Sequence, residues 1–179
     1  MPRFRVPPIK YIQKILPDCF HGTDIASYKS VCNDGFHHST GPEQFLGDGV
    51  YFWEGSELLA VRWAIKKTKR ARAQTYVVIQ ATIDLGYCLD LTKPEHLEIV
   101  EEAAQKLKAE TPSYVINDPV VINFIDYAIQ KLDTIRSINP KSKKLIFKGS
   151  RFLSNVEPII CVRNTENILY FELSQKDKI

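Results

Sequence analysis

The stretch that decides the fold lies in two pieces, Cys-Phe-His-Gly-Thr at residues 19–23 and Phe-Leu-Gly-Asp-Gly-Val-Tyr-Phe at residues 45–52. The first piece ends a short apolar run, and the second leads from a glycine-rich turn into another. Short apolar runs bounded by glycine are typical of paired strands rather than of a packed helix. We therefore expect a cleft between two strands that admits a flat ring.

Three residues of this stretch are suited to holding such a ligand. Gly22 has no Cβ, so a ligand can approach its backbone N–H and C=O closely. The neighbouring His21 can hold a ligand hydroxyl, and Tyr51 can offer its ring face for stacking. An alternative interpretation makes residues 21–23 a turn with a capping Thr23 and makes Tyr51 a core aromatic residue on a strand.

At these residues the sequence resembles the family of poly(ADP-ribose) polymerase-like (PARP-like) ADP-ribosyltransferases, which carry a His, a Tyr and a Glu on three separate strands. The resemblance is dense over residues 19–64 and thin over residues 65–145. It returns at residues 155–162, Asn-Val-Glu-Pro-Ile-Ile-Cys-Val, where Glu157 opens an apolar run like that of the family's last catalytic strand.

The resemblance implies a role for each member of the His-Tyr-Glu set. His21 would hydrogen-bond the adenine-side ribose of NAD, the Gly22 backbone would hold the nicotinamide amide, and Tyr51 would stack on the nicotinamide ring. Glu157 would contact the nicotinamide ribose and stabilise the positive charge that develops as the glycosidic bond breaks. The full set expected to bind NAD is His21, Gly22, Thr23, Gly49, Tyr51, Phe52, Ser56 and Trp63. No metal is expected.

One nicotinamide contact departs from the family pattern. Many relatives carry a Ser on the helix after the Tyr, whereas Leu59 occupies the corresponding position here and Ser56 lies three residues earlier. Trp63 is expected either to wall the pocket from the opposite side or to be a core residue of that helix.

The implied activity is that of an NAD-dependent mono-ADP-ribosyltransferase, with NAD as co-substrate and a protein or nucleic acid as acceptor. Two other functions remain open. Water as the acceptor would make the protein an NAD glycohydrolase, and a catalytically silent module would use the same cleft to bind ADP-ribose or a nucleotide.

A run of cations at residues 66–72 gives a hint about partners. Such a run is usually a solvated helix end, and it can also contact a nucleic-acid backbone. The net charge of the chain is only +3, so the protein is not strongly basic. The residues of this run are Lys66, Lys67, Lys69, Arg70 and Arg72.

The order of expected elements indicates an α+β fold, and specifically an ADP-ribosyltransferase-like fold with mixed and antiparallel sheets flanked by helices around an NAD cleft. A single domain is expected over residues 1–179. Helices are expected at 25–32, 56–72, 94–109 and 120–135, and strands at 50–53, 75–83, 145–147, 155–162 and 168–171. Residues 9–16 are expected to form a helix or a strand that stops at Pro17, and Gly86 is expected to end strand 75–83.

Composition and cysteine usage indicate which classes of protein are not expected. Hydrophobic residues make up 44% of the chain, and no apolar run is long enough to cross a membrane. The start of the sequence lacks the apolar core of a secretion signal, so a cytoplasmic location is expected. The four cysteines have no metal-binding spacing and are expected to be buried free thiols.

Overall fold

Six strands and four α-helices make up the described part of the computed structural model, which comprises residues 8–41, 43–113, 115–140, 145, 148, 150 and 156–179. The strands are β1 (Tyr11–Asp24), β2 (Val50–Glu54), β3 (Thr75–Asp90), β4 (Thr134–Ile138), β5 (Pro158–Val162) and β6 (Ile168–Lys178). The helices are α1 (Ile25–Asp34), α2 (Glu57–Arg70), α3 (Pro94–Glu110) and α4 (Asp118–Phe124). The expected mixture of helix and strand is confirmed.

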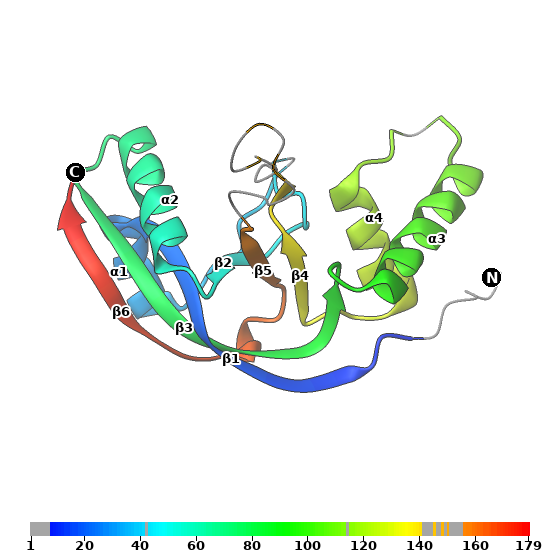
Figure 1. Ribbon diagram of the computed structural model, residues 1–179, viewed down its shortest axis with the longest axis horizontal. Coiled ribbons are helices and arrows are strands. Elements are labelled where there is room, and N and C mark those ends of the chain that lie inside the picture. The colour runs from blue at the N-terminus through cyan, green and yellow to red at the C-terminus, as the bar shows by residue number, and fades with distance from the viewer. Residues whose placement is uncertain are drawn as a thin grey trace.

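The strands form one sheet that closes on itself. Their order is β1-β2-β5-β4-β3-β6, and β1 also pairs with β3, so five strands form a ring and β6 lies outside it on β3. Every pairing is antiparallel except that of β3 with β4. The long strands β1, β3 and β6 curve beneath the short central strands β2, β5 and β4 (Figure 1).

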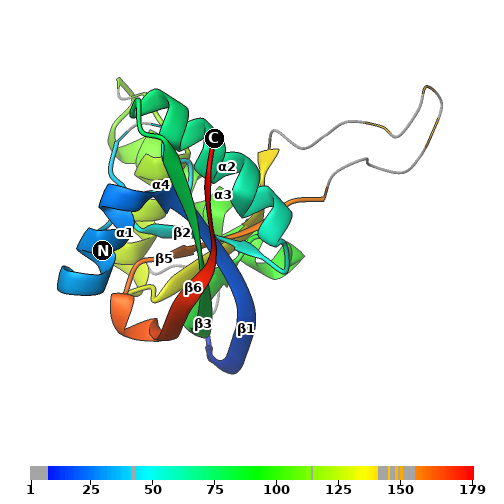
Figure 2. The same ribbon diagram turned by 90° about the vertical axis from the view of Figure 1, so that its left-hand side faces the viewer.

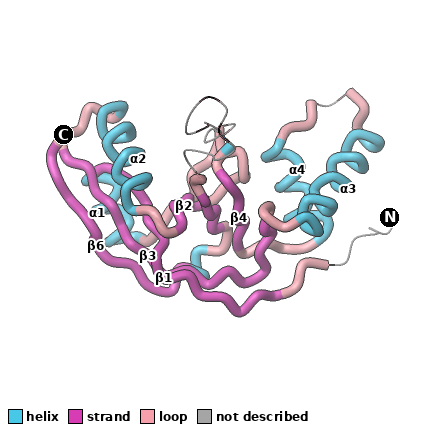
Figure 3. Tube along the Cα trace, in the orientation of Figure 1, coloured by secondary structure: helices cyan, strands magenta, loops and turns pink. Residues whose placement is uncertain are grey.

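Helices flank the central strands on both sides. The pair α1 and α2 lies on one side, and the pair α3 and α4 lies on the other (Figure 3). One apolar core fills the inside of the ring with residues such as Phe52, Ile83 and Ile160. A second core lies between the outer face of the central strands and the helices α3 and α4, and it includes Ile125 and Ile135.

The helix caps agree with the sequence. Ser56 accepts a hydrogen bond from the backbone N–H of Leu59, which places it at the N-cap of α2 as expected. Asp24 caps α1 by accepting from the backbone N–H groups of Ala26 and Ser27. Gly35 follows α1 with φ +82° and donates its N–H to the carbonyl of Val31, as a helix-ending glycine does.

Two expected strand ends are wrong. Pro17 does not stop the first element, because β1 continues to Asp24 and two irregularities in its pairing with β3, one of them between Leu16 and Cys19, absorb the break. Gly86 does not end β3, because its φ of +56° bends the strand while the strand continues to Asp90. Figure 2 shows how β3 runs between β1 and β6 on the side that faces the viewer.

The helix expected at residues 120–135 is too long. The α4 helix ends at Phe124, a π-helical turn follows over Ile125–Ile129, and residues 134–138 form β4. Leu132 and Ile135 continue the apolar helical spacing, but both are fully buried and Ile135 pairs with Cys161 of β5. Pairing on both sides with β3 and β5 therefore overrides the local pattern.

Some expectations are not tested or need a smaller correction. The strand expected at 145–147 lies outside the described residues except for Leu145. The four cysteines are free, and three of them are buried, but Cys32 is exposed. No helix in the described ranges is long and apolar enough to cross a membrane.

Candidate functional site

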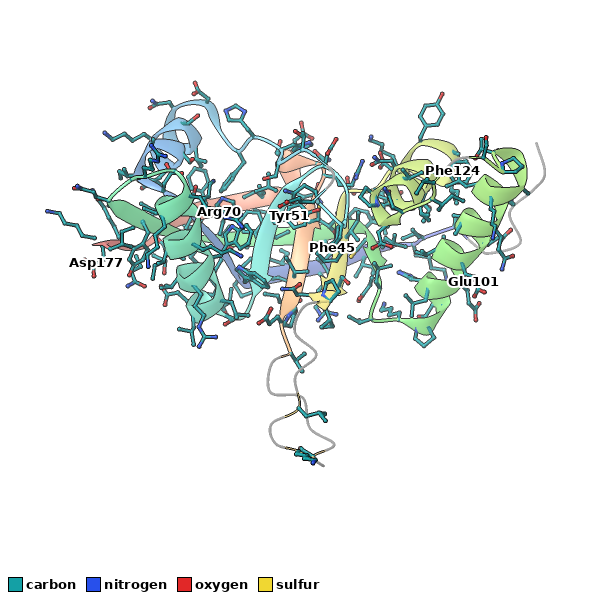
Figure 4. The ribbon with its side chains drawn as sticks, turned by 90° about the horizontal axis from the view of Figure 1, so that it is seen from above. Phe45, Tyr51, Arg70, Glu101, Phe124 and Asp177 are labelled. Atoms are coloured by element: carbon teal, nitrogen blue, oxygen red, sulfur yellow. The ribbon has the colours of Figure 1, made fainter. Side chains whose placement is uncertain are left out.

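A cavity of about 370 Å³ opens where β1, β2, β5 and α2 meet. Its volume falls within the range of small-molecule sites. It is lined by His21, Gly22, Ser39, Glu43, Gln44, Phe45, Tyr51, Phe52, Trp53, Trp63, Lys67, Asn139, Pro140 and Ile159. Figure 4 shows Tyr51 and Phe45 near the centre of the molecule, between α2, marked by Arg70, and the helices marked by Glu101 and Phe124.

The imidazole of His21 is held in one tautomer at the cavity wall. Its Nδ1 lies 2.8 Å from the backbone carbonyl oxygen of Tyr51, and a carbonyl only accepts, so Nδ1 carries the proton. The ring packs against Phe36 and Phe52. This burial lowers the pKa of His21 to about 4, with a smaller contribution from the charge of Lys67. At neutral pH His21 is therefore uncharged, and its Nε2 is a hydrogen-bond acceptor.

The ring of Tyr51 is fixed at its far end. Its hydroxyl donates to the carbonyl oxygen of Gly47 at 2.7 Å and accepts from the backbone N–H of Leu46 at 3.2 Å. Burial raises the pKa of this hydroxyl far above its ordinary value, so it stays protonated. The loop before β2 thus holds an aromatic ring at the cavity wall in one orientation.

Gly22 lies where β1 crosses α2 at close range. A Cβ at this position would lie 2.1 Å from the carbonyl oxygen of Ala60 and 2.9 Å from the backbone nitrogen of Ala64. Only glycine fits there, because backbone atoms of the helix cannot move aside as a flexible side chain could. The same close approach brings the α2 residues Trp63 and Lys67 to the cavity.

Both tryptophans of the chain line the cavity. Trp63 is 44% exposed, so the interpretation of Trp63 as a core residue is wrong. Trp53 lies on β2 opposite Ile159 of β5, and both line the cavity. Flat apolar surface from these side chains suits a ring ligand.

Lys67 lines the cavity, whereas its sequence pattern indicated only membership of the cation run at residues 66–72, as a solvated helix end or a nucleic-acid contact. Its Nζ donates to the hydroxyl of Thr23 at 2.8 Å, and its side chain lines the cavity. Lys66, Lys69, Arg70 and Arg72 are exposed, and Lys66 lies over the Trp63 ring. The signal was present in the sequence, since Lys67 follows the buried Ala64 by three residues and so lies beside it on the helix surface.

Glu157 lies immediately before β5, next to the cavity but not on its lining. Its Oε2 accepts a hydrogen bond of 2.8 Å from the Nδ2 of Asn139, and its backbone carbonyl accepts from the backbone N–H of the same residue. Asn139 does line the cavity, as does Ile159, which alternation places on the same face of β5 as Glu157. The carboxylate is therefore joined to the cavity wall through Asn139, a residue that no sequence motif singled out.

Three further expected residues lie off the lining. Thr23 is fully buried and contacts Lys67, and Ser56 caps α2. Gly49 is needed for packing, because a Cβ there would lie 2.4 Å from the Sγ of Cys161. Phe52 lines the cavity beside His21. Within the described ranges, no three His, Cys, Asp or Glu side chains are grouped so that they could hold a metal ion.

Comparison with known proteins gives distant structural similarity alone. No protein-family model matches the sequence, and no curated protein matches it. Among solved structures, the MbcT–MbcA toxin–antitoxin complex of M. tuberculosis contains a chain that matches with a TM-score of 0.44 and 13% sequence identity. The match covers 94% of this chain and 86% of the other. A similarity at this level does not assign the protein to a family.

Proposed function

We propose that the cavity binds NAD and that the protein transfers ADP-ribose from NAD to a macromolecular acceptor, with release of nicotinamide. The observation that carries the proposal is the convergence of residues far apart in the sequence. His21, Gly22 and Tyr51 line one cavity, and Glu157 is hydrogen-bonded to Asn139 on the lining of the same cavity. Of these residues, all except Asn139 were identified by the resemblance to PARP-like ADP-ribosyltransferases.

The geometry supports a division of the cavity between the two ends of NAD. The acceptor Nε2 of the neutral His21 suits a ribose hydroxyl. The fixed Tyr51 ring, with Trp53 nearby, suits the planar nicotinamide. The pairing of β1 with β2 ends at Phe20, so β2 does not cover the edge of β1 at Gly22, where a ligand could reach the backbone.

Glu157 supplies the charge that the reaction needs. When the bond between the ribose C1′ and the nicotinamide nitrogen breaks, the electron pair leaves with nicotinamide and positive charge develops at the ribose. A carboxylate held in place by Asn139 is suited to stabilise this charge, because a preorganised group needs no reorganisation as the charge develops. The acceptor then attacks C1′, and its proton passes to the carboxylate or to water.

The test is incubation of the protein with labelled NAD and separate pools of protein, RNA and DNA. A transferase leaves label on one pool, and that pool identifies the acceptor class. The Glu157→Gln variant should leave every pool unlabelled, whereas the control Glu98→Gln, at an exposed position of α3, should label as the unmodified protein does. Release of free ADP-ribose with no labelled pool would instead indicate an NAD glycohydrolase. Binding of ADP-ribose without any turnover would indicate a silent module.

A further inference from the structure

The cation run on α2 is divided by the way the helix packs. Ala60, Ala64 and Thr68 form the buried face of α2, and Ala60 and Ala64 lie against Gly22 of β1. Lys67 stands at the border of this face, and its side chain contacts Thr23 of β1 and lines the cavity. Its neighbour in the run, Lys69, is exposed. One lysine of the run is thus separated from the solvated helix end.

The charge of Lys67 has no carboxylate partner within ion-pair distance among the described residues. Its Nζ donates to the neutral hydroxyl of Thr23, and an ammonium group has three donors. The nearby Asp24 carboxylate is already engaged by Ala26 and Ser27 at the start of α1. Desolvation lowers the pKa of Lys67, while the charge of Asp24 opposes this effect. A half-buried cation in this position favours an anionic ligand group.

The surroundings narrow the class of anion. The cavity is lined mainly by aromatic and apolar side chains, and its one lining carboxylate, Glu43, is exposed. His21, whose acceptor nitrogen suits a sugar hydroxyl, lines the same cavity and lies near enough to Lys67 for the lysine charge to act on its pKa. A ligand with a flat base, a sugar and a phosphate group would match the aromatic side chains, the His21 acceptor nitrogen and the Lys67 charge in turn.

We propose that Lys67 binds the diphosphate of a nucleotide in this cavity and thereby selects phosphorylated ligands over nucleosides. The inference rests on the proposed NAD function, since the diphosphate in question is the one that joins the two halves of NAD. Lys67 would donate a charge-assisted hydrogen bond to a phosphate oxygen while it keeps its contact with Thr23. The role is one of binding and specificity and involves no proton transfer.

The two cavity tryptophans provide the readout. Because the chain has no other tryptophan, a ligand that enters the cavity should change the intrinsic fluorescence directly. ADP-ribose, adenosine and nicotinamide are titrated into the unmodified protein and into Lys67→Met, Lys67→Arg and the control Lys69→Met. ADP-ribose should bind Lys67→Met about tenfold more weakly or worse, as expected for loss of a hydrogen bond to a charged group. Lys67→Arg should retain most of the affinity, and Lys69→Met should retain all of it.

Ligands without phosphate separate this inference from the proposed function. Adenosine and nicotinamide should bind Lys67→Met as they bind the unmodified protein. If ADP-ribose binds Lys67→Met with unchanged affinity, the role of Lys67 is refuted while the NAD site stands. If neither ADP-ribose nor nicotinamide binds the unmodified protein, the NAD site and this inference both fail.

A second measurement does not depend on the folding of a variant. Inorganic pyrophosphate should compete with ADP-ribose for the unmodified protein but should leave nicotinamide binding unchanged, because it occupies only the position at Lys67. The affinity for ADP-ribose should also fall as salt is added, since counterions screen the lysine charge. Failure of pyrophosphate to compete, together with an affinity that does not depend on salt, would overturn the inference.

Discussion

The wall of the cavity formed by β1, β2 and α2 differs from the wall formed by β4 and β5 in how its side chains are held. The first, which we call the binding wall, consists of His21, Gly22, Tyr51, Trp63 and Lys67. Backbone packing and hydrogen bonds to backbone groups hold it in place, as at Gly22 and at the Tyr51 hydroxyl.

The second wall, which we call the carboxylate wall, consists of Asn139 and Ile159 on the lining, together with Glu157, which is hydrogen-bonded to Asn139. Its carboxylate, that of Glu157, lies off the lining and is joined to the cavity wall by a side-chain hydrogen bond from Asn139. From this difference we expect that binding and chemistry can be altered separately. Substitutions on the binding wall should act on affinity and stability, and those on the carboxylate wall should act on the rate.

The largest effect is expected from Glu157→Gln. This change removes a charge that matters in the transition state, so nicotinamide release should slow by roughly a hundredfold or more while NAD affinity is kept. Release is measured by chromatography, and affinity is measured by titration calorimetry. Unmodified rates in this variant would move the catalytic role away from the carboxylate wall, with Glu166 and Glu172 as the next candidates.

Gly22→Ala is the corresponding change on the binding wall. The new methyl group would meet the backbone of α2 at Ala60, so β1 and the helix would have to separate. We expect a loss of about 1–3 kcal/mol in the free energy of unfolding, together with weaker NAD binding. Chemical denaturation measures the first quantity, and Glu157→Gln is the matched control, because it should unfold as the unmodified protein does. A Gly22→Ala variant of full stability would contradict the close packing of β1 on α2.

Asn139→Ala tests whether the carboxylate wall depends on a single contact. Without the Nδ2 donor the Glu157 side chain can turn away, and nicotinamide release should slow by about tenfold, a barrier change of about 1.4 kcal/mol. The melting temperature and the NAD affinity should change little. Asn33→Ala, at an exposed position of α1, is the control. An equal fall in affinity would place Asn139 on the binding wall instead.

Tyr51→Phe keeps the ring but removes its anchor. The carbonyl of Gly47 and the N–H of Leu46 both lose their partner, which costs about 1 kcal/mol. NAD should therefore bind a few times more weakly, with little change in the rate at saturation. Calorimetry and saturation kinetics measured together separate the two effects. A variant that lost rate but kept affinity would remove the contrast between the walls.

The smallest expected effect is a dependence of folding stability on pH that arises from His21. Burial lowers its pKa from 6.5 to about 4, so between these values the unfolded chain binds a proton that the folded protein does not. The stability contributed by the neutral ring is thus complete above pH 6.5 and is lost as the pH falls toward 4. The melting temperature of His21→Gln should decline less over this interval than that of the unmodified protein. His37→Gln, at an exposed position, should follow the unmodified curve.

The binding wall could largely be predicted from sequence because its signals are local. Gly22, Tyr51 and the Ser56 cap lie within one stretch whose turns and helix start are set by neighbouring residues. The position of Lys67 could have been inferred from its spacing after Ala64. The carboxylate wall was predicted only at Glu157 and the strand that follows it.

The rest of the carboxylate wall depends on pairing between distant segments. Residues 134–138 form β4 because they pair with β3 and β5, and the apolar spacing of Leu132 and Ile135 also fits a helix. Asn139 gains its role only when β4 brings it beside Glu157. The pairing of β1 with β3 likewise could not be predicted from local sequence, because nothing in either strand specifies the other as its partner.

One strand connects the two walls. The first half of β3 pairs with the part of β1 that carries His21 and Gly22, and its last three residues pair with β4. Gly86 lies between these halves, at the bend. The backbone conformation at this glycine therefore sets the angle between the part of β3 that pairs with β1 and the part that pairs with β4. A substitution at Gly86 would therefore change how the two walls are placed relative to each other without altering any residue that lines the cavity.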